Sequence, residues 1–300
     1  MIRPFRALAA ATLFLVAALP AHAAPPVPLL WKVSDADNSV YLLGSFHVLT
    51  AGDYPLAADV DAAFADAESL AFELSPEEAN SPALAQQMTL AAVRRHPGSL
   101  RQDLGPELWK RLDTYAAANG LPLAQLSTLE PWYVALAVSL VEMGKMGLDP
   151  ALGLDRHFMD AAARAGKPVA GLELASEQIA VLAGMTPLEQ KQMLAEALGQ
   201  AEEGPDEYRD MHEAWRAGDA ERLWTQMAAE MKRDYPALYR RINIERNDAW
   251  IPELEQRLAR KDGDTLVVVG ALHLLGEDGV VEKLRARGYR VERICSACGH

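Results

Sequence analysis

The segment Tyr41-Leu42-Leu43-Gly44-Ser45-Phe46-His47 is an apolar run that ends in the pattern Gly-x-x-His. A second copy, Leu266-Val267-Val268-Val269-Gly270-Ala271-Leu272-His273, lies near the other end of the 300-residue chain. Continuous apolar runs of this length predict strands that are buried on both faces, as in a parallel sheet. Because glycine permits a sharp turn where a strand ends, each histidine is expected at the carboxyl end of a strand, where open α/β sheets bind their ligands.

The two copies are followed by the same order of elements. After His47 come a turn, a stretch with helical periodicity and an apolar strand, within residues 48–74. After His273 come a glycine-rich turn, a helical stretch and a strand, within residues 274–294. Both segments read strand, Gly-x-x-His, helix, strand, which is the order expected of a duplicated βαβ unit.

We therefore predict a mixed α/β fold in which residues 28–75 and 264–295 supply the central sheet and residues 76–261 form a long helical insert. One short strand, 168–172, interrupts the helices of the insert and leads into Glu173. Helical periodicity and prolines suited to a first helical turn predict helices at 79–94, 106–119, 131–145, 154–165, 176–184, 187–200, 205–217, 219–232 and 236–260.

Residues 1–23 match a secretory signal peptide. Arg3 and Arg6 precede an apolar core at 7–19, and Ala21-His22-Ala23 fits the cleavage site. The core is too short to span a bilayer, although an uncleaved membrane anchor is the alternative interpretation. We expect a periplasmic or secreted protein with a single domain, residues 24–300, and no membrane span after cleavage.

Charge and cysteine content narrow the functional classes. The chain carries a net charge of −13, and residues 24–300 carry −15 because the first 23 residues contain two Arg and no acid. Such a balance argues against binding to nucleic acid or to anionic membranes. The two cysteines, Cys295 and Cys298, are predicted to form a local disulfide or to remain inert thiols in an oxidising compartment. With His300 they would lack the four ligands of a structural zinc site.

Glu73 is a carboxylate within the apolar segment 69–74. Burying an unpaired charge is costly, so Glu73 needs a partner, and we expect the strand of His47 to be its neighbour. The alternative is a solvated glutamate at the end of a surface strand. His47, Glu73 and His273 together would be a three-ligand set for a divalent metal, with a position left open for water. The sequence contains no G-x-S-x-G, H-E-x-x-H or P-loop motif.

Three further polar residues are secondary candidates for the site: Asp155, Glu173 and Asn247. Asp155 opens a predicted helix, where it is first interpreted as a capping charge, and Asn247 lies beside Arg246. Arg246 is either a clamp for an oxyanion or a substrate carboxylate, or an ordinary surface charge. The remaining histidines of residues 24–299 are expected to be surface residues without a role: His96, His157 and His212.

Several motifs follow one another along the chain in an order that is typical of one family. They are Leu43-Gly44-Ser45-Phe46-His47, Phe72-Glu73-Leu74, Gly153-Leu154-Asp155, Val169-Ala170-Gly171-Leu172-Glu173 with Glu177-Gln178, Glu245-Arg246-Asn247, and Val269-Gly270-Ala271-Leu272-His273 followed by Gly276 and Gly279. On these motifs the chain resembles the TraB/GumN-type family (TraB/PrgY/GumN), which also includes the animal Tiki metalloproteases. The resemblance implies one site formed by two Gly-x-x-His motifs and a carboxylate, divalent-metal-dependent hydrolysis of peptides as in Tiki-like members, and a fold similar to erythromycin esterase-like and ChaN-like proteins.

Three functions follow as hypotheses. The first is an exported metal-dependent hydrolase, acting on peptides with Mn, Co or Zn held by His47, Glu73 and His273. The second is a metal-independent, esterase-like hydrolase of small molecules, in which a histidine is the general base and Arg246 stabilises the oxyanion. The third is a periplasmic metal- or haem-binding protein, or an envelope-associated protein, without catalysis.

Overall fold

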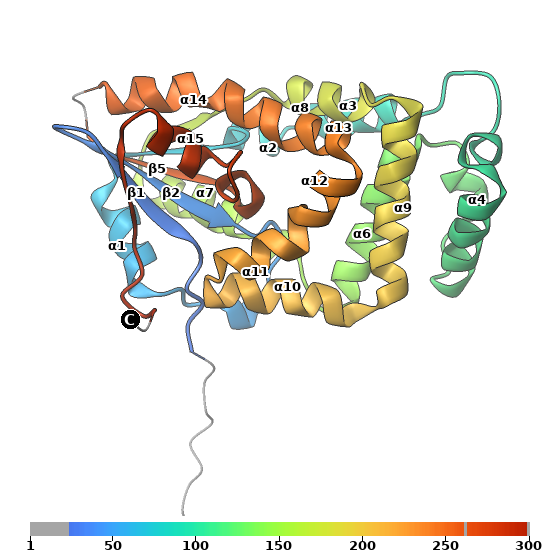
Figure 1. Cartoon of the computed structure of the whole chain (residues 1–300), viewed down its shortest axis with the longest axis horizontal. Coiled ribbons are helices and arrows are strands. Elements are labelled where there is room, and N and C mark those ends of the chain that lie inside the picture. Colours follow the sequence, from blue (N-terminus) through green and yellow to red (C-terminus); the bar gives the residue numbers. More distant parts are fainter. Residues whose placement is uncertain (1–23, 261–262, 299–300) are drawn as a thin grey trace, which may run out of the picture.

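A mixed sheet of six strands forms one end of the structure, on the left in Figure 1. The structure is a computed structural model that describes residues 24–260 and 263–298. The predicted signal peptide, residues 1–23, lies outside the described residues. β1 is antiparallel to both of its neighbours, whereas the other contiguous pairs are parallel. In spatial order the strands are β4 (Val169–Gly171), β3 (Ser69–Phe72), β5 (Thr265–Gly270), β2 (Ser39–Ser45), β1 (Leu30–Ser34) and β6 (Arg290–Arg293). The predicted mixed α/β fold is confirmed.

The two Gly-x-x-His strands, β2 and β5, are adjacent, and every residue of both is buried. β5 also pairs with β3 and therefore separates β3 from β2. The prediction that the strand leading to Glu73 neighbours the strand of His47 is wrong. β5 is apolar on both faces, as is typical of an interior strand of a parallel sheet, and it takes the interior position between β3 and β2.

The helical insert also contributes to the sheet. Its short strand β4 pairs in parallel with β3 and forms one edge of the sheet. The strand predicted at 168–172 is thus present, and it adds an edge strand to those that residues 28–75 and 264–295 supply.

Each Gly-x-x-His segment leads through a helix to another strand. Helix α1 (Ala58–Asp66) connects β2 to β3, with β5 between them, and helix α15 (Val280–Ala286) connects β5 to β6, with β2 and β1 between them. The predicted order of elements is present in both segments, although the two connections cross different numbers of strands. Duplication itself, and a likeness to esterase-like and ChaN-like folds, stay predictions.

Helices fill most of the insert, and Figure 1 shows α4, α6 and α9 extending away from the sheet. Two π-helical segments, η3 (Thr225–Ala229) and η4 (Arg240–Ile244), interrupt the helices predicted at 219–232 and 236–260. No helix among the described residues is long and apolar enough to cross a bilayer. The helices of this region are α2 (Pro76–Ala79), α3 (Pro82–Ala92), α4 (Leu100–Ala118), α5 (Leu123–Leu126), α6 (Pro131–Lys145), α7 (Leu154–Ala165), α8 (Ala175–Ala183), α9 (Pro187–Glu203), α10 (Pro205–Ala217), α11 (Ala220–Trp224), α12 (Glu230–Asp234), α13 (Pro236–Tyr239) and α14 (Glu245–Leu258).

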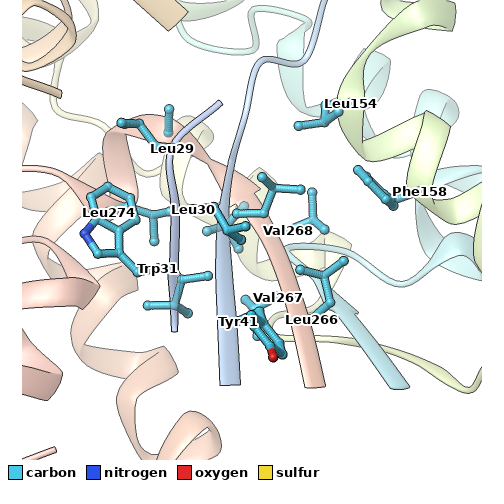
Figure 2. Packing of buried hydrophobic residues seen from close by; sticks show 14 of the residues in the cluster. Leu29, Leu30, Trp31, Tyr41, Leu154, Phe158, Leu266, Val267, Val268 and Leu274 are labelled. Atoms are coloured by element: carbon cyan, nitrogen blue, oxygen red, sulfur yellow. The ribbon is translucent and has the colours of Figure 1, made fainter. Parts of the chain in front are cut away.

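The largest apolar core joins the sheet to the helices that cover it. Figure 2 shows Leu154 and Phe158 of α7 near Leu266 and Val268 of β5, and all four side chains are buried in this core. Fully burying a side chain of this kind contributes roughly 1.5–3 kcal/mol, so the packing anchors α7 on the sheet. The backbone N–H of Leu154 also donates to the carbonyl of Phe46, 3.1 Å away. The start of α7 is therefore held against the loop that carries His47.

A buried carboxylate ties that loop to the helical insert. Asp53 is fully buried, and one of its oxygens accepts hydrogen bonds from the backbone N–H and the hydroxyl of Thr50, at 2.7 and 2.8 Å. His212 and Arg216 of α10 contact the same carboxylate, with His212 Nε2 3.0 Å from it. His212 is thus a partner of a buried acid, which corrects the expectation of a surface residue. His157 is half-buried as well, stacked on the ring of Tyr54 at 4.6 Å.

Asp53→Asn should destabilise the protein at neutral pH. Burial alone would raise the pKa of Asp53, but the hydrogen bonds from His212 and Thr50 hold it well below its usual range. The folded state therefore prefers the carboxylate, and this stabilisation is present above the unfolded pKa of about 3.9 and lost as the pH falls. We expect the variant to lose about 3 kcal/mol of unfolding free energy at pH 7 in urea titrations.

The difference between wild type and Asp53→Asn should shrink when the same titrations are run at pH 3.5. Asp113→Asn, at an exposed position of α4, is the matched control and should be near neutral at both values. A deficit for Asp53→Asn that is as large at pH 3.5 as at pH 7 would contradict the ionised network.

Candidate functional site

The carboxyl ends of four parallel strands carry the polar residues of one candidate site. His47 follows β2, Glu73 follows β3, Glu173 follows β4, and His273 follows β5 by one helical turn, η5 (Ala271–Leu274). Strands that run in parallel end at the same edge of the sheet, which is where open α/β sheets place their ligands. Residues more than 220 positions apart in the sequence therefore meet at this edge.

Both histidines lie near one oxygen of Glu73. Nε2 of His47 and Nε2 of His273 are each 3.9 Å from Oε1 of Glu73. The backbone N–H of Gly270, the last residue of β5, donates to the same oxygen at 2.8 Å. A Cβ at position 270 would lie 3.0 Å from Nε2 of His47 and 3.2 Å from Oε1 of Glu73. Glycine is therefore needed here to keep space between these two side chains.

Asp155 contacts Nδ1 of the His47 imidazole. Its Oδ2 lies 2.7 Å from Nδ1 of His47 and accepts a hydrogen bond from the hydroxyl of Ser45 at 2.5 Å. The Asp155 carboxylate raises the pKa of His47 to about 9. Asp155 lies in the first turn of α7, yet Gly153 is the N-cap and makes no side-chain cap. The interpretation of Asp155 as a simple capping charge is therefore replaced by a contact within the site.

Close backbone packing sets the position of Asp155. A Cβ at Gly153 would lie 2.1 Å from the carbonyl oxygen of His47. Leu49 and Asp149 exchange backbone hydrogen bonds of 2.9 and 3.3 Å beside this contact. Only glycine allows the start of α7 to approach the His47 loop so closely, and that approach brings Asp155 to Nδ1.

Arg246, in the first turn of α14, is committed to protein acceptors. Nε and Nη2 donate to the two oxygens of Glu173, at 3.1 and 2.5 Å, and Nη2 also donates to Oε2 of Glu73 at 2.6 Å. Nη1 donates to Nε2 of His273 at 3.0 Å and to the carbonyl of Ile242 at 3.4 Å. These contacts use all five N–H groups of a guanidinium. The alternative that Arg246 is an ordinary surface charge is wrong.

His273 is a buried neutral imidazole. Its Nδ1–H donates a hydrogen bond to Oδ1 of Asn247, 2.7 Å away, so the lone pair is on Nε2, where Arg246 donates. Asn247 is itself oriented by a 2.8 Å hydrogen bond from its amide to the carbonyl of Asp278. The ring packs on Trp250 at 4.5 Å, and burial lowers the pKa of His273 to about 3.

Glu73 is a charged carboxylate in spite of its burial. Burial alone would raise the pKa of Glu73, but Arg246, the two histidines and the N–H of Gly270 bring it well below its usual range. Gln178 of α8 adds a further donor, with its amide 2.6 Å from Glu173 and 3.3 Å from Glu73. The alternative of a solvated glutamate at the end of a surface strand is thereby excluded.

A cavity of about 360 Å³ opens beside His47 and Glu73. Its volume lies within the range of small-molecule sites. The His47 side chain is 60% exposed, so its imidazole is accessible from the cavity, whereas that of His273 is only 7% exposed. Besides His47 and Glu73, the cavity is lined by Phe72, Leu74, Ala79, Asn80, Pro150, Asp155, Arg156, Met159 and Gln178.

No role was predicted from the sequence for Ser45, which contacts Asp155, or for the lining residues Asn80, Arg156 and Gln178.

The predicted metal ligands His47, Glu73 and His273 converge, but they are not arranged as a preformed metal site. No group of three or more His, Cys, Asp or Glu among residues 24–260 and 263–298 has the spacing of one. The chemical reason is that Nε2, the one ring nitrogen of His273 with a free lone pair, already accepts a hydrogen bond from Arg246. A metal ion could use this nitrogen only after Arg246 has moved.

Comparisons with known proteins confirm the resemblance to the family. The model of the TraB/PrgY/gumN family matches residues 29–293. Two relatives are the uncharacterized protein YbaP of Escherichia coli (strain K12) and that of Shigella flexneri. Each is 25% identical over 245 residues, which cover 82% of this chain and 87% of the relative. No solved structure is significantly similar to the chain.

The raised pKa of His47 can be tested directly by NMR titration of its imidazole in metal-free protein. The pKa should lie at about 9 in the wild type. Asp155→Asn should lower it toward 6.5, because the variant removes the negative charge that stabilises the imidazolium. A His47 that titrates near 6.5 in the wild type would contradict this electrostatic picture.

Proposed function

We propose that this chain, which belongs to the TraB/PrgY/gumN family, is an exported hydrolase that cleaves an ester or amide bond of a peptide or small molecule. One observation carries the proposal. Nε2 of His47 and Oε1 of Glu73 lie 3.9 Å apart on the wall of the cavity, with Asp155 behind the imidazole. This arrangement supports the binding and deprotonation of a water molecule beside a bound carbonyl group.

His47 acts as the general base. When it is neutral, the contact with Asp155 keeps its proton on Nδ1 and leaves the lone pair on Nε2. Nε2 takes a proton from the attacking water, and the resulting imidazolium returns it to the leaving group. Asp155 stabilises the imidazolium, as the aspartate does in a Ser-His-Asp triad.

Glu73 orients the water and does not take its proton. A water molecule can lie within hydrogen-bond distance of both Nε2 of His47 and Oε1 of Glu73, because the two atoms are 3.9 Å apart. The neighbours of the two groups shift their pKa values in opposite directions, up for His47 and down for Glu73. Such divergence identifies which group carries the proton in an acid–base pair.

Arg246 acts as a positioning residue in this scheme. It holds Glu73, Glu173 and His273 in place, and its five N–H groups are all in use. The earlier hypothesis that Arg246 clamps an oxyanion would require it to give up one of these contacts. We therefore assign it to keeping Glu73 charged and oriented.

A metal-dependent form of the same hydrolysis is the second candidate. It is favoured by the equal 3.9 Å distances from both Nε2 atoms to Oε1 of Glu73. His47, Glu73 and His273 would hold Mn, Co or Zn once Arg246 has released Nε2 of His273. When bound, such an ion would lower the pKa of a water molecule to about 7 and polarise the substrate carbonyl.

The proposal of export has independent support. Residues 1–23 have the pattern of a signal peptide, and Cys295 and Cys298 form the predicted local disulfide. Disulfides persist in oxidising compartments and are rare in the cytosol. A periplasmic or secreted location is consistent with both features.

His47→Ala should lower kcat/KM at least about 100-fold, because general-base catalysis contributes about 10²–10⁴-fold. Glu73→Gln should also lower it, because the amide replaces the charged oxygen that accepts from the water. The rates are measured on a panel of N-acyl amino acid esters and short peptides, with His96→Gln as the control at an exposed histidine.

The pH dependence gives a second prediction. In the wild type kcat/KM should rise toward pH 9, because His47 must lose its proton to act as a base, and Asp155→Asn should move this rise to lower pH. Full activity of His47→Ala would contradict the proposal that His47 is the general base.

Removal of metal separates the two candidates. Protein purified without chelators is analysed for bound metal, then assayed before and after EDTA treatment. Unchanged activity in protein free of metal is expected for the His47 base. Loss of activity that Mn²⁺, Co²⁺ or Zn²⁺ restores would instead establish the metal-dependent form. Tight binding of metal or haem without turnover of any ester or peptide would establish the non-catalytic alternative.

A further inference from the structure

We propose that Arg156 binds a carboxylate of the substrate and makes the site selective for molecules that carry one close to the bond that is cleaved. This inference rests on the proposed function for the position of the cleaved bond, but it can be tested by binding alone. Arg156 follows Asp155 in the first turn of α7 and lines the same cavity as His47 and Glu73.

Arg156 retains donors that the protein does not use. Its side chain is 51% exposed. Nη1 donates to Oδ1 of Asn80 at 2.5 Å, and Nε lies 3.7 Å from Asp160, which is too long for a hydrogen bond. A guanidinium has five N–H groups, arranged as a fork that matches a carboxylate. Arg246, the other arginine near the cavity, has all five of its own in use.

Asn80 holds the guanidinium at the edge of the cavity. Asn80 also lines the cavity, and its amide nitrogen donates to the carbonyl of Pro76 at 2.8 Å. This bond fixes which end of the amide is the acceptor, so Oδ1 is the atom presented to Arg156. Because Asn80 follows α2 and Arg156 belongs to α7, their contact joins two walls of the cavity. A partly ordered arginine loses less side-chain entropy when it binds a ligand.

Two cations line the cavity, the His47 imidazolium, whose charge is already paired with Asp155 at 2.7 Å, and the Arg156 guanidinium. The pairing of His47 leaves Arg156 as the favoured place for an anionic group. The carboxylates of Asp155 and Glu73 are already paired, with His47 and Ser45 and with Arg246 and Gly270 respectively. A substrate carboxylate close to Glu73 would meet like charge. Beside Arg156 it meets a cation whose nearest acid, Asp160, is more than half exposed. The uncharged carbonyl that is cleaved is then left for His47.

Two kinds of ligand share this chemistry. One is the free α-carboxylate at the end of a peptide or N-acyl amino acid, which would make the cleavage that of a terminal residue. The other is the side-chain carboxylate of an acidic residue within a chain. The probes are N-acetylalanine, which has only the α-carboxylate, and N-acetylaspartic acid α-amide, which has only the side-chain carboxylate. N-acetylalanine amide is the neutral reference.

Binding of these probes is measured by NMR titration of the full protein, in the wild type and in His47→Ala. At least one acid should bind 10-fold or more tightly than the neutral amide, and the tighter acid identifies the source of the carboxylate. Arg156→Gln should weaken that acid at least 10-fold, and Arg156→Lys should weaken it less. Arg164→Gln, an exposed arginine of the same helix, changes the net charge equally and should have no effect.

Turnover supplies the second readout. On a carboxylated substrate Arg156→Gln should act mainly on KM, whereas His47→Ala should act on kcat. Equal binding of acid and amide by the wild type, or binding of the acids that Arg156→Gln does not weaken, would overturn the proposal. If neither ester nor peptide is hydrolysed but the acids bind through Arg156, the proposed function fails and the assignment of Arg156 stands.

Discussion

The arrangement of the site depends on one buried ion cluster. A guanidinium and two carboxylates are withdrawn from water at the carboxyl edge of the sheet, and their side chains are only 8–15% exposed. Isolated charges at this depth would be very unfavourable. The cost is offset only when the hydrogen bonds are complete, and Arg246 achieves this with contacts to Glu73, Glu173 and His273. The ends of β3, β4 and β5 are therefore held together by the requirement that one arginine be fully satisfied.

Two glycines also shape the site. Gly270 leaves room between His47 and Glu73 while its N–H holds the carboxylate, and Gly153 lets α7 approach the loop after β2. The site therefore consists of two linked halves. One is the rigid, buried half around Arg246, and the other is the accessible half around His47 and Asp155. The proposed chemistry lies where the halves meet, between a fixed carboxylate and an exposed imidazole.

The elements could be predicted from the sequence more completely than their arrangement. The apolar runs identified the buried strands, and prolines placed the starts of α6, α9 and α10 because proline suits a first helical turn. Strand order was not predictable, since an apolar run shows that a strand is buried but not which strand flanks it. The π-helical segments before Arg246 have no periodic signal. The direction of a single side chain, such as Asp155 toward His47 or Arg156 toward Asn80, depends on packing between segments far apart in sequence.

The two Gly-x-x-His motifs look equivalent in the sequence, yet their surroundings give the two imidazoles different chemistry. The imidazole of His47 contacts Asp155 through Nδ1 and lines the cavity, so it can gain and lose a proton in contact with a substrate. At His273, Asn247 contacts Nδ1, Trp250 packs on the ring and Arg246 donates to Nε2. This imidazole therefore remains neutral and is not accessible to a substrate. A symmetric pair of metal ligands would need similar access for both rings. The asymmetry instead favours a division of labour, in which one histidine transfers the proton and the other completes the set of acceptors that holds Arg246 in place.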